Sequence, residues 1–128
     1  MSNAPDALRT HLLKLLGWRD AHADFEQAVA GVPPALRGAV PAGLPHSPWQ
    51  LLEHLRLAQR DILDFCRDPG YVEPTWPDDY WPAHAEPPTA TAWDESVSAF
   101  RADREALRAL VADPATDPFA RIPHGQGQ

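Results

Sequence analysis

Residues 46–65 read HSPWQLLEHLRLAQRDILDF, and this stretch decides the fold. Its apolar side chains recur at steps of three and four residues, which predicts one amphipathic helix. The stripe consists of Leu51, Leu55, Ala58, Ile62 and Phe65. Ser47 is a favourable N-cap and Pro48 suits the first helical position, so the helix is expected to begin there. It should end near Arg67, before the sequence DPG.

Two further segments show helical spacing, one on each side of this stretch. The first covers 5–30 and has a stripe at His11, Leu15, Trp18, His22, Phe25 and Val29. Gly17 is expected to kink this segment or to split it in two. The other runs from Thr91 or Trp93 to Ala112, with a stripe at Trp93, Val97, Phe100, Arg104, Leu107 and Val111. Three long helices predict an all-α, antiparallel up-down helical bundle that forms one domain over 1–128.

Residues 68–92 form a long loop with six prolines and no sustained periodicity. The loop carries four aromatic side chains, Tyr71, Trp76, Tyr80 and Trp81. Aromatic residues at this density pack on a domain face or line a pocket. We therefore expect the loop to lie against the helices.

Composition excludes several classes of function. The chain of 128 residues has 44% hydrophobic residues and a formal net charge of −7, with no basic run, which argues against nucleic-acid binding. No apolar run approaches the roughly 20 residues of a membrane span. The N-terminus lacks the apolar core of a signal peptide, so the prediction is a cytoplasmic protein. The single cysteine, Cys66, excludes an intrachain disulfide.

His54 lies on the apolar side of the 46–65 helix, where an imidazole has two interpretations. It is either a core histidine hydrogen-bonded to a neighbour or a metal ligand that points into the bundle. His22 poses the same choice on the first segment. Gln50, one turn before His54, is a candidate partner or pocket residue, and His84 can reach a pocket from the aromatic loop. The sequence has no pair of histidines at i and i+4, the strong helical signal for a metal.

Two charged residues, Arg104 and Asp61, lie on helical faces that could contribute to a site. Arg104 interrupts the third stripe. Its side chain either snorkels to the surface, forms an interhelical ion pair or binds the carboxylate of a substrate. Asp61 lies seven residues after His54, roughly 10 Å along the helix axis. That separation prevents the two side chains from sharing one metal ion.

The segments AHADFEQAV, SPWQLLEHLRLAQRDILDF, YWP, AWDESVSAFRADREALRALV and DPFARIPHGQGQ, in this order and spacing, resemble the DinB-like superfamily. The resemblance implies a four-helix bundle whose zinc or nickel ion is held by three histidines. One comes from the second helix, where His54 matches, and two come from an H-x-x-x-H on the last helix. Only three long helices are evident here, so the resemblance implies a domain that is incomplete at its C-terminus.

Two alternative functions follow, the first from the resemblance and the second from the wide apolar stripes of the three helices. The first is a metal-dependent S-transferase or isomerase that uses a low-molecular-weight thiol and a small-molecule substrate. Its pocket would include His22, Gln50, Trp81 and His84, and the catalytic residues are unknown. The second is a non-catalytic bundle that acts through self-association or partner binding. Three helices with wide stripes should expose apolar surface, so a homodimer is expected.

Overall fold

The computed structural model describes residues 4–18 and 23–125, and these residues form an all-α structure. The α-helices are α1 (Ala4–Leu15), α2 (Phe25–Ala30), α3 (Pro48–Arg67) and α4 (Ala92–Ala112). Two short 3₁₀ turns, η1 (Pro34–Leu36) and η2 (Asp78–Tyr80), lie in the connections. The described residues contain no strand. The predicted fold class, an all-α helical bundle, is therefore confirmed.

Local sequence signals determine where α2 and α3 begin. Ser47 caps α3: its hydroxyl accepts a hydrogen bond from the Gln50 backbone N–H at 3.2 Å, and the Gln50 side chain accepts from the Ser47 N–H at 3.0 Å. Asp24 and Gln27 form the same reciprocal capping box at the start of α2. Such boxes satisfy backbone donors that have no partner inside the helix. The predicted bounds of α3 and the predicted end of α4 are confirmed.

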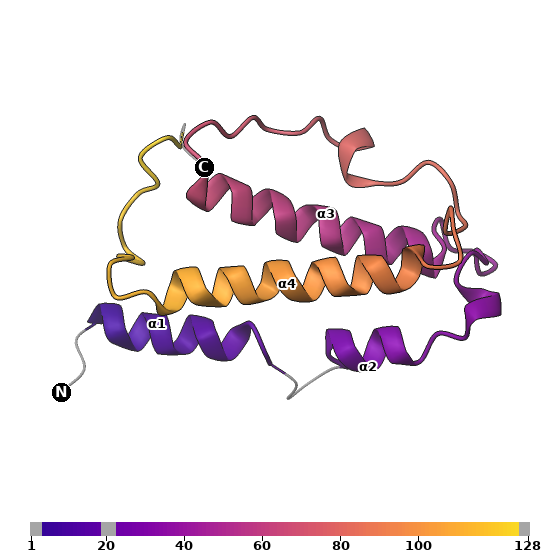
Figure 1. Ribbon diagram of the computed structural model, residues 1–128, viewed down its shortest axis with the longest axis horizontal. Coiled ribbons are helices and arrows are strands. Elements are labelled where there is room, and N and C mark those ends of the chain that lie inside the picture. The colour runs from indigo at the N-terminus through magenta and orange to yellow at the C-terminus, as the bar shows by residue number, and fades with distance from the viewer. Residues whose placement is uncertain (1–3, 19–22, 126–128) are drawn as a thin grey trace.

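The first helical segment is divided, as the glycine at position 17 allowed. Helix α1 ends at Leu15, Gly17 lies in a turn, and α2 begins only at Phe25 after its Asp24 cap. Figure 1 shows α1 and α2 following one another along the same side of α4. Together they form one interrupted wall of the bundle.

Helix α4 lies between α3 and the row formed by α1 and α2 (Figure 1). The strictly antiparallel order needs one correction, because α3 and α4 run in the same direction. Gln59 donates to the Phe100 carbonyl at 2.8 Å, and Arg60 pairs with Asp103 at 3.1 Å, so numbers rise together along both helices. The cause is the connection 68–91, which returns along α3 before α4 begins (Figure 1). Parallel neighbours require such a long return.

The core lies where the first turns of α3 and α4 meet. Its buried residues are Trp49, Leu52, Ala92, Trp93 and Val97, with Phe25, Val29 and Val32 packed against them. Burial of these large apolar side chains supplies the main favourable free energy of folding. Within the described chain, no helix is long and apolar enough to cross a membrane.

The predicted stripe of α3 is not the face that this core buries. Leu51, Leu55 and Ile62 have exposed fractions of 48, 50 and 56%. The residues of α3 that are buried are Trp49, Leu52 and Leu63, which lie about a quarter of a turn or more away on the helix surface. Helix α3 therefore has two apolar faces, and α4 covers the one that the sequence pattern did not select.

Candidate functional site

His54 lies midway along α3 and contacts the loop that returns from its C-terminus. Its Nδ1 is 3.0 Å from the backbone carbonyl oxygen of Tyr80. A carbonyl only accepts hydrogen bonds, so this contact requires a proton on Nδ1, and in the neutral imidazole Nε2 then carries the lone pair. His54 is half-buried and hydrogen-bonded.

Trp81 is stacked between two imidazole rings. The His54 ring lies 3.8 Å from the Trp81 ring, with an angle of 6° between their planes. The His46 ring covers the other face at 3.9 Å and 15°. Trp76 meets His54 edge-on at 6.0 Å. We call His46, His54, Trp76 and Trp81 the histidine–aromatic cluster.

Asp61 fixes the same loop to α3 two turns after His54. Its carboxylate accepts hydrogen bonds from the Tyr80 hydroxyl at 2.6 Å and the Tyr71 hydroxyl at 2.5 Å. Burial raises the pKa of Tyr80 to about 12, helped by the neighbouring negative charge of Asp61. The pKa of Tyr71 is raised by the same two causes. Tyr80 thus contacts α3 twice, through its hydroxyl at Asp61 and through its carbonyl at His54.

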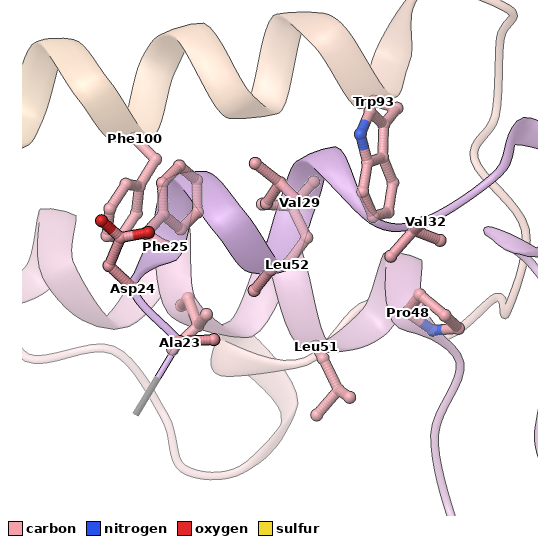
Figure 2. A pocket seen from close by; sticks show the side chains of 12 residues that line it. Ala23, Asp24, Phe25, Val29, Val32, Pro48, Leu51, Leu52, Trp93 and Phe100 are labelled. Carbon is pink, nitrogen blue, oxygen red and sulfur yellow. The ribbon is translucent and has the colours of Figure 1, made fainter. Parts of the chain in front are cut away.

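An apolar groove runs between α3 and the wall made by α1 and α2. It consists of two adjoining depressions of about 400 and 460 Å³ that share Leu55 and Phe100. Figure 2 shows the first: α2 and the residues after it contribute Phe25, Val29 and Val32, α3 begins with Pro48, Leu51 and Leu52, and α4 contributes Trp93 and Phe100. The second is lined by Leu12 and Leu15 of α1 and by Leu16 directly after this helix, with Ala58 and Ile62 from α3. One charged residue, Asp24, lines the described groove.

Polar contacts attach the wall made by α1 and α2 to α4. Glu26 of α2 accepts hydrogen bonds from Arg101 and Arg104 at 3.0 Å each. The hydrogen bond from Arg101 is the main cause that lowers the pKa of Glu26 to about 2. Arg108 of α4 donates to the Leu13 carbonyl of α1 at 3.0 Å. The predicted interhelical ion pair of Arg104 is therefore confirmed, and its guanidinium lies over the rings of the apolar groove residues Phe25 and Phe100.

Comparison with known proteins identifies the family. The model of the DinB superfamily matches residues 18–128, which is most of the chain. The chain belongs to the DinB superfamily. No curated protein and no solved structure matches it. The resemblance noted from the sequence is confirmed at the level of family.

The pocket residues expected for a DinB protein have different surroundings. Gln50 caps α3 and also donates to the Pro82 carbonyl at 3.1 Å, so it holds the loop. Trp81 belongs to the histidine–aromatic cluster, which includes the metal candidate His54. His84 is exposed and lies beside a different depression, near Trp49. His22 lies outside the described residues.

A three-histidine metal site is not complete within the described residues. They contain no group of three or more His, Cys, Asp and Glu side chains that could hold one ion. His124 binds elsewhere: its Nε2 is 2.5 Å from the Phe65 carbonyl oxygen. His11 is exposed on α1. Binding of zinc or nickel with His54 as a ligand therefore remains a prediction.

Sequence reasoning missed the roles of Asp61 and His46. Asp61 seemed relevant only as a metal ligand too distant from His54, whereas it reaches His54 through Tyr80. His46 lies in the loop before α3, and its ring stacks on Trp81. The density of aromatic residues in the loop was the usable signal, and the expected packing of this loop on the helices is confirmed.

Proposed function

We propose that this DinB-superfamily domain acts in the cytoplasm by binding an amphipathic helix in its apolar groove, through self-association or with a partner protein. One observation carries the proposal: Leu51, Leu55 and Ile62 are about half exposed along one groove wall. Apolar surface contributes roughly 25 cal/mol of stabilisation for each Å² removed from water. Contiguous exposed apolar surface in a groove is typical of an interaction site.

The spacing along α3 favours a helix as the occupant. Leu51, Leu55, Ala58 and Ile62 follow one another at +4, +3 and +4, which is the repeat of a coiled-coil seam. Side chains at this spacing interlock with a second helix that crosses at about 20°. A row of shallow apolar depressions with one charged lining residue gives a small polar molecule few hydrogen-bond partners. These features support helix-in-groove recognition.

The test replaces Leu55, which lines both depressions. The probe is a fluorescein-labelled helical peptide with leucine at heptad positions a and d and Glu or Lys elsewhere, followed by fluorescence anisotropy. We expect Leu55→Glu to weaken binding at least about tenfold, because it places a charge in an apolar contact. Circular dichroism should be unchanged, since Leu55 is half exposed.

Val72→Glu is the matched control. Val72 is 83% exposed and lies in the loop outside the groove, so the same charge there should leave peptide affinity unchanged. Equal binding by wild type and Leu55→Glu would exclude the groove as the helix-binding site. Equal losses in both variants would indicate a nonspecific effect of charge, with the same consequence.

The second candidate function is metal-dependent S-transfer or isomerisation with a low-molecular-weight thiol and a small-molecule substrate. One observation favours it: the contact of Nδ1 with the Tyr80 carbonyl makes Nε2 the nitrogen of the neutral His54 ring that can bind a metal. Histidines that bind metals commonly donate their other ring N–H to such a carbonyl. The remaining ligands of the zinc or nickel ion would have to come from outside the described residues.

This candidate is tested by metal content, measured by elemental mass spectrometry after incubation with zinc or nickel and gel filtration. The metal-dependent function requires near-stoichiometric metal in the wild type and loss of it in His54→Ala. His84→Ala is the control, because His84 is an exposed histidine of the loop that packs on His54, and this variant should retain the metal. A wild-type protein without bound metal would exclude this function for the chain.

A further inference from the structure

We infer that a polar cleft between α3 and α4 binds a small zwitterion, a molecule that carries both an ammonium and a carboxylate group, as a free amino acid does. The cleft has a volume of about 320 Å³, at the lower end of the range for ligand pockets. Glu53 and Arg56 of α3 line it on one side, and Glu95 and Ser96 of α4 line it on the other. We call it the α3–α4 cleft.

The α3–α4 cleft is separate from the apolar groove. Its α3 residues Trp49, Glu53 and Arg56 follow one another at +4 and +3, so they share one face of the helix. The groove residues Leu51 and Leu55 lie on nearly the opposite face of α3. No residue that lines the cleft lines either depression of the groove. The inference therefore does not rest on helix binding by the groove.

Ser96 supplies the observation that points to a ligand. Its exposed fraction is 4%, and its hydroxyl has no hydrogen-bond partner among the described residues. A serine inside a helix ordinarily bonds a carbonyl of the preceding turn or points to solvent. Buried polar groups are nearly always paired in folded proteins. An unpaired hydroxyl in the wall of a cleft therefore indicates that a polar group of a ligand pairs with it.

The charged residues of the cleft also have hydrogen-bonding groups left for a ligand. Arg56 donates from Nε to Oε2 of Glu53 at 2.5 Å, and no described residue accepts from its Nη1 or Nη2. These two nitrogens form a planar fork that matches a carboxylate. Glu95 accepts from the Thr91 hydroxyl through Oε1 at 2.9 Å, and no described residue donates to its Oε2. The cleft thus offers donors to a carboxylate and an acceptor to an ammonium.

The two signs of charge in one small cleft select a ligand that carries both. Two carboxylates stand against one guanidinium, so a ligand with a carboxylate alone would meet a lining of negative formal charge. A ligand with an ammonium alone would leave the fork of Arg56 unpaired. A zwitterion places its carboxylate at Arg56 and its ammonium at Glu95, and the Ser96 hydroxyl can bond either group.

The rest of the lining is apolar and predicts the ligand's side chain. Trp49, which is 5% exposed, lines the cleft together with Pro88, Ala92 and Ala99. Trp49 and Pro88 also line an adjoining depression of about 330 Å³. An apolar side chain can extend over both residues while the charged groups bind at the cleft. Leucine, methionine and phenylalanine are therefore the probes.

The test titrates the full chain, labelled with nitrogen-15, with each of these three amino acids and follows its amide NMR signals. We expect at least one to bind with a dissociation constant below about 1 mM and to shift the signals of 53–56 and 95–99. For that amino acid, the amine without the carboxylate and the acid without the ammonium should each bind at least about tenfold more weakly. Binding of none of the three would overturn the inference, as would an equally tight amine or acid.

Charge variants locate the binding groups. Arg56→Gln and Glu95→Gln should each weaken binding at least about tenfold, and Glu95 is exposed, so its variant should keep the fold. Arg60→Gln is the matched control, because Arg60 lies one turn further along α3 and pairs with Asp64 and Asp103 outside the cleft. It should leave the affinity unchanged. Equal losses in Arg56→Gln and Arg60→Gln would indicate a nonspecific effect of charge and overturn the inference.

Ser96→Ala separates ligand binding from packing. Removing an unpaired buried hydroxyl should not lower the free energy of unfolding, whereas the amino acid should bind about threefold more weakly or worse. Unchanged affinity in Ser96→Ala would mean that the hydroxyl contacts no ligand and would overturn the inference. Leu55→Glu should bind the amino acid as the wild type does, so failure of the groove proposal and failure of this one are distinguishable.

Discussion

Leu63→Ala is expected to destabilise the fold by about 2–5 kcal/mol. The Leu63 side chain is fully buried, with an exposed fraction of 0%. Its removal loses the transfer free energy of three carbon atoms and leaves a cavity that a packed interior refills only in part. Urea unfolding followed by circular dichroism measures the change in the free energy of unfolding.

Ile62→Ala is the matched control, because it truncates the neighbouring residue by a similar volume. Ile62 is 56% exposed, so its truncation should cost less than about 1 kcal/mol in a monomer. Both variants should be made in the Leu55→Glu background, since a dimer would bury Ile62 and hide the difference. A larger loss for Ile62→Ala than for Leu63→Ala in that background would mean that α3 buries the opposite face.

Several features of the fold could be predicted from the sequence. The start of α3 was predictable because Ser47 is a favourable N-cap and Pro48 suits the first helical position, and its end was predictable from the sequence DPG. The all-α class followed from three periodic segments. The division of the first segment was an open choice at Gly17, and the structure has two helices there.

The buried face of α3 was not predictable from periodicity. The sequence of α3 contains two apolar sets, Leu51, Leu55 and Ile62 against Trp49, Leu52 and Leu63. Helical spacing marks both sets, and only the path of the rest of the chain decides which one α4 covers. The 68–91 connection carries α4 to the Trp49 side, and it has no periodicity from which its path could be derived.

The histidine–aromatic cluster was predictable only in part, because it also depends on the path of the 68–91 connection. The position of His54 on a helix and the aromatic content of the loop were both visible in the sequence. The partners were not, because Tyr80 and Trp81 are 26 and 27 residues from His54 and meet it only after the loop returns. The sequence placed His54 on the apolar side of the helix, whereas its ring contacts Trp81 of the loop.

Asp61→Asn is expected to loosen this loop and to change the titration of both tyrosines. Tyr71 and Tyr80 are the two tyrosines of the chain, so the ultraviolet absorbance of tyrosinate reports on them alone. In the wild type their hydroxyls should stay protonated well above pH 10, because the pKa of Tyr80 is raised to about 12 and that of Tyr71 is also raised. Removing the negative charge of Asp61 should lower both midpoints toward 10.

The same shifts predict how stability depends on pH. A tyrosine whose pKa is higher in the folded state stabilises the fold fully below its unfolded pKa near 10. That contribution is lost as the pH rises from about 10 through the folded pKa of about 12. At neutral pH, Asp61→Asn should cost about 1.5–3 kcal/mol in the free energy of unfolding, the usual range for hydrogen bonds to a charged group.

Asp64→Asn is the control for the loss of one acidic charge on α3. Asp64 pairs with Arg60 at 3.1 Å on the more exposed side of the helix, so the tyrosine titration should not change. A wild-type titration centred near pH 10 would show that the hydrogen bonds to Asp61 do not persist in solution. If both midpoints shift only in Asp61→Asn, the loop that places the Tyr80 carbonyl against His54 is held by Asp61, and the orientation of His54 depends on a carboxylate seven residues away.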